Sequence, residues 1–229
     1  MNFVRTALTA ATLLAVASPA YAVTITTIFT PGNSDVPAYI TNPESLRTFD
    51  EVVAPNNTPY VANPLFNNER TTGVVRTRNP SDPSAPQPSA GTFLVVGANR
   101  ASAGSYSIDF TGQVFSFLIG SLDPFNSVTL NFTGRPAITL TGRQIVTGDT
   151  TTPTATTGLT TGRVTYDLGG VGVFTGATFS STRGAFEFDQ LVTAVPEPAT
   201  WLMMILGFGL VGGQLRRRKV NTKVTFARA

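Results

Sequence analysis

The ionisable and nucleophilic side chains of this chain restrict the chemistry that it can perform. It contains neither His nor Cys, so Ser-His-Asp triads and Cys-His sites are excluded. Residues 23–194 also contain no Lys, which excludes a Ser-Lys pair there. No Gly-x-Ser-x-Gly sequence and no phosphate-binding loop ending in Gly-Lys is present. The usual sequence signatures of hydrolases and nucleotide-binding enzymes are therefore missing.

One pair of carboxylates has a spacing that could support catalysis. Glu187 and Asp189 are two positions apart, so on a strand they share a face, roughly 7 Å from each other. Paired carboxylates hydrolyse glycosides in many enzymes. Phe186 and Phe188 alternate with them, however, as is typical of a strand with one buried and one polar face. We favour the polar face, and we expect no catalytic residue and no enzymatic activity.

Oxygen ligands for calcium are present, although not in a compact motif. Asp109, Asp123, Glu187 and Asp189 are candidates because Ca²⁺ prefers carboxylate and carbonyl oxygens. No Asp-x-Asp-x-Asp-Gly loop occurs, and Asp123 could equally bond to the backbone of its own turn. We therefore expect no cofactor, with calcium as the one candidate metal.

Aromatic and hydroxyl side chains could contact a polysaccharide or ice. Tyr39, Tyr60 and Tyr106 are candidates for stacking on sugar rings, whereas most Phe residues are needed for a core. Ice binding could be suggested by two clusters of threonines, namely Thr24, Thr26 and Thr27, and residues 150–152. Ice requires a flat, regular array of side chains, and these runs are irregular, so ice is not the expected ligand.

Segments with alternating apolar residues indicate that strands carry these side chains. The alternation is clear in residues 114–121, 128–133, 163–168 and 185–192. Turn-forming sequences separate the segments, namely Asp123-Pro124, Gly134-Arg135-Pro136, Gly169-Gly170 and Arg183-Gly184. Short strands at this spacing, with no clear amphipathic helix, predict an all-β body, an antiparallel β-sandwich with a jelly-roll-like arrangement.

Two segments are predicted to be loops within a single domain. Residues 79–90 are rich in Pro and Ser and should form an extended, mobile excursion. Residues 147–162 are rich in Thr and could form a long hairpin loop or weakly paired strands. Because the strands on both sides of each loop look alike, we expect one domain over residues 23–194.

The distribution of charge argues against a nucleic-acid partner. The formal net charge of +3 arises from basic residues near the C-terminal end. Within residues 23–194 the acidic side chains outnumber the arginines, which are scattered singly. A phosphate-binding surface needs clustered Lys and Arg, so we expect no nucleic acid to bind.

Residues 1–22 have the three parts of a secretory signal peptide. Arg5 supplies the positive charge, and residues 7–17 form an apolar run that is too short to span a bilayer. Ala20 and Ala22 are the small residues of an Ala-x-Ala cleavage site. We expect signal peptidase to cut after Ala22, so that the mature chain begins at Val23.

Residues 195–219 combine a proline motif, an apolar run and a basic cluster. Pro196, Glu197 and Pro198 precede the apolar residues 199–215, and the cluster follows. As a helix the run reaches about 25 Å, the short end of a membrane span. Trp201 at one edge and the cations at the other suit the two interfaces, and the cations would stay cytoplasmic. We expect a transmembrane helix over residues 199–215 and a short polar tail over 220–229.

The stretch VPEPATWLMMILGFGLVGGQLRRRK, residues 195–219, resembles the PEP-CTERM sorting signal in its proteobacterial form, which is also catalogued as an ice-binding protein C-terminal domain. The resemblance implies that an exosortase, a membrane cysteine protease-transpeptidase, recognises Pro196, Glu197 and Pro198. It also implies that the segment beginning at Trp201 spans the inner membrane, and that Arg216, Arg217 and Arg218 act as the stop. The usual hosts are Gram-negative producers of exopolysaccharide. This chain continues further beyond the basic cluster than the family's tails usually do.

The central strands and the final Phe-Glu-Phe-Asp strand also resemble bodies that carry such tails, which implies a sandwich without an assigned activity. We therefore expect an exported surface or extracellular-matrix protein with a non-enzymatic structural or adhesive role linked to exopolysaccharide. A carbohydrate-binding module with structural calcium is the first alternative, and a polysaccharide hydrolase is the second. Exposed Tyr and carboxylates on a concave face would favour these alternatives, whereas a face covered by Thr and Ser would favour the structural role.

Overall fold

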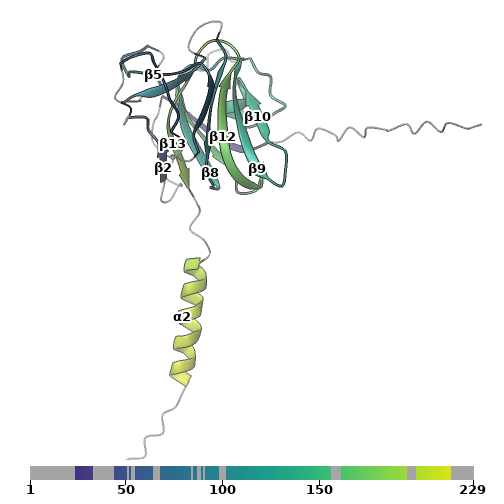
Figure 1. The fold of residues 1–229 in the computed structure, drawn as a ribbon. Helices are drawn as coiled ribbons and strands as arrows, with labels where there is room; N and C mark the ends of the chain where they lie inside the picture. Colours follow the sequence, from purple (N-terminus) through teal and green to yellow (C-terminus); the bar gives the residue numbers. More distant parts are fainter. Residues whose placement is uncertain are drawn as a thin grey trace, which may run out of the picture.

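The computed structural model describes residues 24–32, 44–50, 52, 55–63, 68–83, 85–86, 89, 91–97, 102–155, 161–194 and 200–217. Two antiparallel sheets face each other in a sandwich, and an apolar helix follows it (Figure 1). The predicted all-β sandwich is confirmed, whereas the jelly-roll-like arrangement stays a prediction.

The larger sheet has eight strands, and its middle is formed by the last strand of the body. Its order along the sheet is β1 (Thr26–Pro31), β11 (Gly162–Asp167), β8 (Val114–Ile119), β13 (Phe186–Ala194), β6 (Phe93–Val96), β5 (Val75–Arg78) and β3 (Thr58–Pro59). The remaining strand, β2 (Glu44–Arg47), also pairs with β13. The ladder of β13 shifts register between Asp189 and Val192, where Gln190 has a positive φ of 46°. This bulge lets one strand pair with β6 at one end and with β2 at the other.

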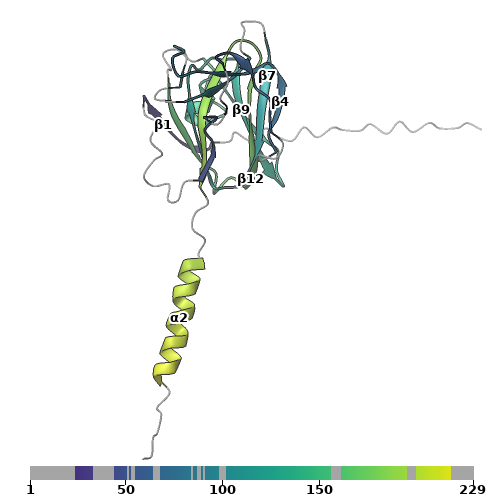
Figure 2. The ribbon, with the colours of Figure 1, turned by 60° about the vertical axis from the view of Figure 1, so that its left-hand side comes forward.

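The smaller sheet has five strands and covers one side of the larger one (Figure 2). Its order is β10 (Ile138–Thr141), β9 (Asn126–Thr133), β12 (Val173–Ser181), β7 (Gly104–Asp109) and β4 (Arg70–Gly73). Inward and outward residues alternate strictly in β9, as the sequence pattern predicts. The single turn α1 (Gln144–Thr147) lies between β10 and β11.

The core between the sheets is largely aromatic. Phe179 of β12 and Phe188 of β13 stack with their ring centroids 4.1 Å apart, which joins the two sheets directly. Phe117 of β8 meets Phe179 edge to face at 5.0 Å. All three side chains are fully buried. The alternating Phe residues of the sequence therefore form the contact between the layers.

The outer face of the larger sheet is also covered, which the sequence analysis did not predict. Phe93 and Val95 point away from the main core and pack with Ala85 in a second small cluster. Arg78 pairs with Asp82 at 2.7 Å at the start of this covering segment. The prediction of an extended excursion is therefore wrong for the described part of residues 79–90. The physical reason is that β6 is apolar on both faces, so both faces need cover.

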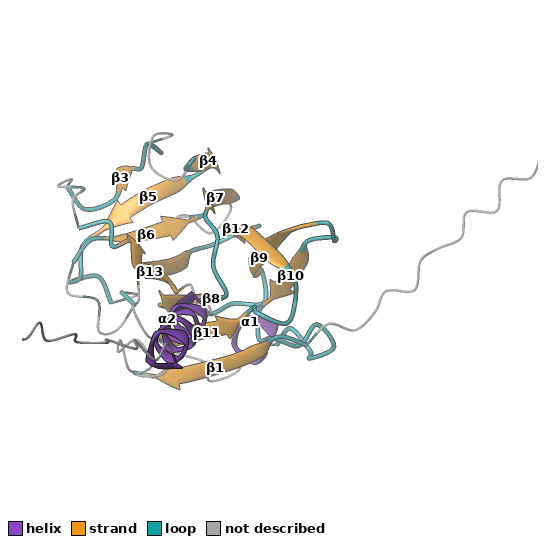
Figure 3. Ribbon diagram, turned by 90° about the horizontal axis from the view of Figure 1, so that it is seen from below, coloured by secondary structure: helices purple, strands orange, loops and turns teal. Residues whose placement is uncertain are grey.

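The other predicted boundaries agree with the structure. The four predicted turns separate β8 from β9, β9 from β10, β11 from β12, and β12 from β13. Within the described part of residues 147–162 the chain ends α1 and turns, and Thr24 and Asp149 form an isolated bridge. This part is therefore a loop, as one alternative expected, but it is not a hairpin loop, because β10 and β11 lie in different sheets and do not pair. Seen from below, α1 lies beside β1 at one end of the sandwich (Figure 3).

Candidate functional site

The C-terminal tail leaves the body from the middle of the larger sheet. The strand β13 pairs with β8 on one side and with β6 and β2 on the other, and it ends at Ala194. The Gln113 N–H donates a hydrogen bond to the Ala194 carbonyl at 3.1 Å, and Thr193 Oγ1 donates one to the Val114 carbonyl at 3.0 Å. The last body residues before the tail are thus fixed in the sheet.

The predicted sorting residues are described only where they lie in the helix α2 (Thr200–Arg217). Trp201 lies in its first turn, and Arg216 and Arg217 end it. Arg216 is exposed to solvent. The other predicted sorting and cleavage residues lie outside the described residues, namely Pro196, Glu197, Pro198, Arg218, Ala20 and Ala22. Their roles stay predictions.

The helix α2 exposes a large apolar surface. Ile205, Phe208 and Leu210 are 69%, 72% and 70% exposed. Figures 1 and 2 both show the helix standing away from the sandwich. No described helix has both the length and the apolarity that crossing a membrane requires. The predicted transmembrane helix over residues 199–215 is therefore corrected to an apolar helix of 18 residues that also includes Gln214 and two arginines.

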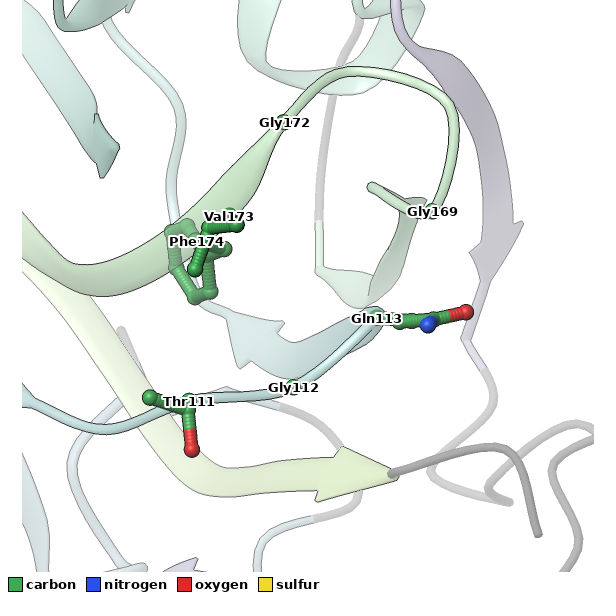
Figure 4. A pocket seen from close by; sticks show the side chains of 7 residues that line it. All are labelled: Thr111, Gly112, Gln113, Gly169, Gly172, Val173 and Phe174. Carbon is green, nitrogen blue, oxygen red and sulfur yellow. The ribbon is translucent and has the colours of Figure 1, made fainter. Parts of the chain in front are cut away.

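A pocket of about 360 Å³ lies beside the point where the tail leaves. It is lined by two loops and the start of β12, namely Thr111, Gly112, Gln113, Gly169, Gly172, Val173 and Phe174 (Figure 4). A Cβ atom on Gly112 would collide with Thr193 Oγ1, so glycine allows this loop to approach the end of β13. No lining side chain is ionisable, and the pocket therefore offers no acid, base or charged nucleophile.

The two carboxylates of β13 are buried rather than presented to solvent. Glu187 and Asp189 are 1% and 2% exposed, because the outer face of the larger sheet is covered. Glu187 accepts a hydrogen bond from Ser121 Oγ at 2.7 Å. Asp189 accepts one from the Ser89 hydroxyl and one from the Gln190 N–H at 2.7 Å. The predicted solvent-facing polar face is thus wrong for this strand, and both carboxylates are bound within the protein.

Burial changes the protonation of one of these groups. It raises the pKa of Asp189 to about 7, although the hydrogen bonds from Ser89 and Gln190 oppose the shift. Asp50 adds to the increase through its negative charge, and the nearby Arg163 guanidinium reduces it. Arg163 is itself buried and donates to Gln190 Oε1 at 2.7 Å. Asp189 therefore titrates near neutral pH inside a closed polar cluster.

The remaining calcium candidates lie apart from this cluster. Asp109 forms a two-bond ion pair with Arg70, with distances of 2.7 and 2.9 Å, and the guanidinium lowers the pKa of its carboxyl group. Asp123 closes the β8–β9 turn through its carbonyl, which accepts the Asn126 N–H at 3.0 Å. Partial burial raises the pKa of its carboxyl group. Nowhere in the described part of the chain do three acidic residues gather as metal ligands would.

Two of the three tyrosines proposed for sugar stacking belong to the interior. Tyr60 and Tyr106 are 7% and 0% exposed, and both donate hydrogen bonds to Glu69, at 2.6 and 2.8 Å. Arg47 Nε lies 2.6 Å from Glu69 Oε1 and neutralises this buried charge. Burial raises the pKa of Tyr60 to about 12 and that of Tyr106 further. These tyrosines are therefore unavailable to a ligand, and Tyr39 lies outside the described residues.

The outer face of the smaller sheet is a candidate binding surface that the sequence analysis did not identify. Two cross-strand rows of hydroxyl side chains cover it, and we call them the hydroxyl face. The first row consists of Thr139, Thr129, Thr178 and Ser107, and the second of Thr141, Ser127, Ser180, Ser105 and Thr72. Every member is exposed or half-buried. Alternating hydroxyls are visible in the sequence of four of the five strands, but only the register places them side by side.

The threonine clusters noted in the sequence are not part of the hydroxyl face. Thr26 and Thr27 lie on β1, at the edge of the other sheet. Thr27 donates to the Ile25 carbonyl at 2.9 Å, and Thr151 donates to Asp149 Oδ1 at 2.7 Å. Both hydroxyl groups thus form hydrogen bonds with a residue two positions earlier in the chain.

Comparison with known proteins identifies the tail. Residues 194–219 match the model of the PEP-CTERM protein-sorting motif. Curated proteins gave no match. A solved structure of TmCBM61 in complex with beta-1,4-galactotriose is similar at a TM-score of 0.30 and 12% identity, covering 55% of this chain and 88% of that chain. So low a score carries no argument about the body.

Tails of this type indicate export and sorting to the cell envelope in bacteria, with processing by an exosortase-type system. The predicted resemblance is thus confirmed, and residues 194–219 of this chain are a PEP-CTERM protein-sorting motif.

Proposed function

We propose that this chain is an exported surface or extracellular-matrix protein of a Gram-negative bacterium, with a structural or adhesive role linked to exopolysaccharide. The observation that carries the proposal is the sorting motif, which begins at the last residue of β13. An exosortase would process the tail near Pro196, Glu197 and Pro198 after a stage at the inner membrane. Signal peptidase would remove residues 1–22.

The position of the motif supports processing without damage to the body. Ala194 is held by the Gln113 N–H, and Thr193 by the Val114 carbonyl, so β13 has its own anchors up to the start of the tail. The described residues of α2 at positions 205–213 are all exposed, so the removal of these residues would uncover no core. A cut between β13 and α2 would therefore leave both sheets intact.

A non-enzymatic role is supported by the state of the polar groups. Glu187 and Asp189 both accept hydrogen bonds from serine hydroxyls of the protein, and the pocket beside the tail has no ionisable lining residue. The hydroxyl face is rich in Thr and Ser, as a structural role would favour. We include no cofactor in the proposal, and we do not pursue the hydrolase alternative.

The experiment that tests this proposal is fractionation of native cells followed by mass mapping of both mature termini. We expect an N-terminus at Val23 and a C-terminus close to residues 196–198, in protein recovered from the envelope or the medium. Cytosolic protein that retains Met1 and residues 199–229 would overturn the proposal.

A further inference from the structure

We propose that the hydroxyl face binds an extended, uncharged polysaccharide laid across the five strands of the smaller sheet. This inference rests on the proposed link to exopolysaccharide and deepens it, because it assigns the surface and the chemical class of the ligand. Three properties of the face favour such a ligand: the spacing of the hydroxyls, their fixed orientation and the balance of charge.

The register of the sheet fixes the spacing. Thr129 lies opposite Thr139 on one side and opposite Thr178 on the other, and Thr178 lies opposite Ser107. Neighbouring strands are about 4.8 Å apart, and the two rows are about 6.8 Å apart along the strands. A row therefore offers one hydroxyl for about each sugar unit of an extended β-linked chain.

Hydrogen bonds within the rows hold these hydroxyls in place. Thr129 pairs with Thr139 at 2.9 Å, Ser107 with Thr178 at 2.9 Å, and Thr72 with Ser105 at 2.6 Å. Each pair uses one hydroxyl hydrogen and leaves the other, together with lone pairs, for a ligand. Threonine is also stiff at χ1. Little side-chain entropy would therefore be lost when a polyhydroxyl chain binds.

The charge of the face selects among ligands. The only charged residues within its five strands are Arg70 and Asp109, at the edge of the sheet, and they neutralise each other in a two-bond pair. The exposed Arg143 and Arg183 follow the ends of β10 and β12. An acidic polysaccharide or a phosphate-bearing surface would find no uncompensated cation among the residues of these five strands. The face is complementary in charge to a neutral glycan, whose hydroxyls can both donate and accept.

The test compares binding of the full chain, kept in mild detergent, to neutral and acidic polysaccharides. The neutral probes are microcrystalline cellulose, mixed-linkage β-glucan and the host's own exopolysaccharide, and the acidic probe is polygalacturonate. The variant Thr129→Val with Thr178→Val removes two central hydroxyls but keeps β-branched side chains. The matched control is Thr26→Val, an exposed threonine on the edge strand β1. Co-sedimentation and affinity electrophoresis give the dissociation constants.

We expect the wild type to bind a neutral probe more tightly than polygalacturonate, the double variant to bind about tenfold more weakly, and the control to bind normally. If the double variant binds the neutral probe as tightly as the wild type does, the hydroxyl face is not the binding surface, whereas the proposed link to polysaccharide stands. Binding to no neutral probe, or a preference for polygalacturonate, would overturn the ligand class. Concentration-dependent dimers that the double variant abolishes, without glycan binding, would show that a second copy occupies the face. The proposed sorting is tested separately, by mapping the mature termini. A failure of the sorting proposal is therefore distinguishable from each of these binding results.

Discussion

The Ser89 hydroxyl donates a hydrogen bond to Asp189 Oδ2, although the two residues are 100 positions apart. This bond joins the segment that covers the outer face of the larger sheet to its central strand. Both residues are buried. The environment of this bond therefore depends on whether the Asp189 carboxyl group is protonated or charged. Because the pKa of Asp189 is about 7, its carboxyl group changes its charge when the pH varies around neutrality.

The free energy of unfolding should fall as the pH rises from about 4 to about 7. Asp189 has a pKa of about 7 in the fold and about 3.9 in an unfolded chain, so the folded state retains a proton that the unfolded state has released. This contribution is complete below the unfolded pKa and is lost as the pH rises through the folded one, a change of roughly 4 kcal/mol. Denaturant unfolding of the full chain at about pH 4.5 and about pH 8 measures it.

The variant Asp189→Asn isolates this group. Its amide can donate to Ser89 and accept from the Gln190 N–H without titrating. We expect the variant to lose most of the slope of stability against pH, whereas Asp167→Asn, at an exposed carboxylate, should retain it. A slope in Asp189→Asn equal to that of the wild type would show that another group is responsible.

The buried pair of Arg47 and Glu69 should stabilise the body much more than the exposed pair of Arg70 and Asp109. Replacement of Arg47 by Met leaves the Glu69 carboxylate buried without its cation, which costs about 3–5 kcal/mol. Arg70→Met should cost less than about 1 kcal/mol, because its side chain is 56% exposed. Denaturant unfolding of the two variants gives the comparison. Similar losses for both would mean that Glu69 is neutralised in another way.

Contact between the sheets should depend on the stack of Phe179 and Phe188. Phe188→Ala removes one ring from a closed core and should cost about 3–5 kcal/mol. Phe208→Ala removes a ring of α2 that is 72% exposed, so the unfolding of the body should not change. Near-ultraviolet circular dichroism during thermal unfolding follows the core. A small loss for Phe188→Ala would indicate that the two sheets do not share one cooperative core.

Recognition by the processing enzyme should depend on the proline motif. With Pro196, Glu197 and Pro198 replaced by Ala, we expect the full-length chain to accumulate in the native host, because these residues form the proline part of the sorting motif. Replacement of Asn221, Thr222 and Thr225 by Ala, beyond the basic cluster, is the matched control and should be processed normally. Immunoblots of cell fractions measure the two forms. Normal processing of the motif variant would show that recognition lies elsewhere in the tail.

Local patterns in the sequence were sufficient to predict four of the strands, namely β8, β9, β11 and β13. The alternation of Val128, Leu130 and Phe132 with polar residues identified β9, and Gly169-Gly170 identified the turn between β11 and β12. Such patterns depend only on neighbours along the chain, which is why they could be read without a structure. The sorting motif was equally local, and it was recognised on the same basis.

Contacts between distant segments could not be predicted in this way. The Phe-Glu-Phe-Asp pattern of β13 is typical of a half-exposed strand, but a covering segment buries Glu187 and Asp189. Tyr60 and Tyr106 looked like surface aromatics because their partner, Glu69, gives no sequence signal of its burial. The hydroxyl face likewise depends on the register between strands far apart in the sequence.

The central position of β13 has a consequence for the order of events during synthesis. This strand is the last part of the body to be made, yet β8, β6 and β2 all pair with it. Until residue 194 has emerged from the ribosome, these strands have an open edge and the aromatic core lacks Phe186 and Phe188. The larger sheet and the shared aromatic core can therefore be completed only after nearly all of the body has been translated.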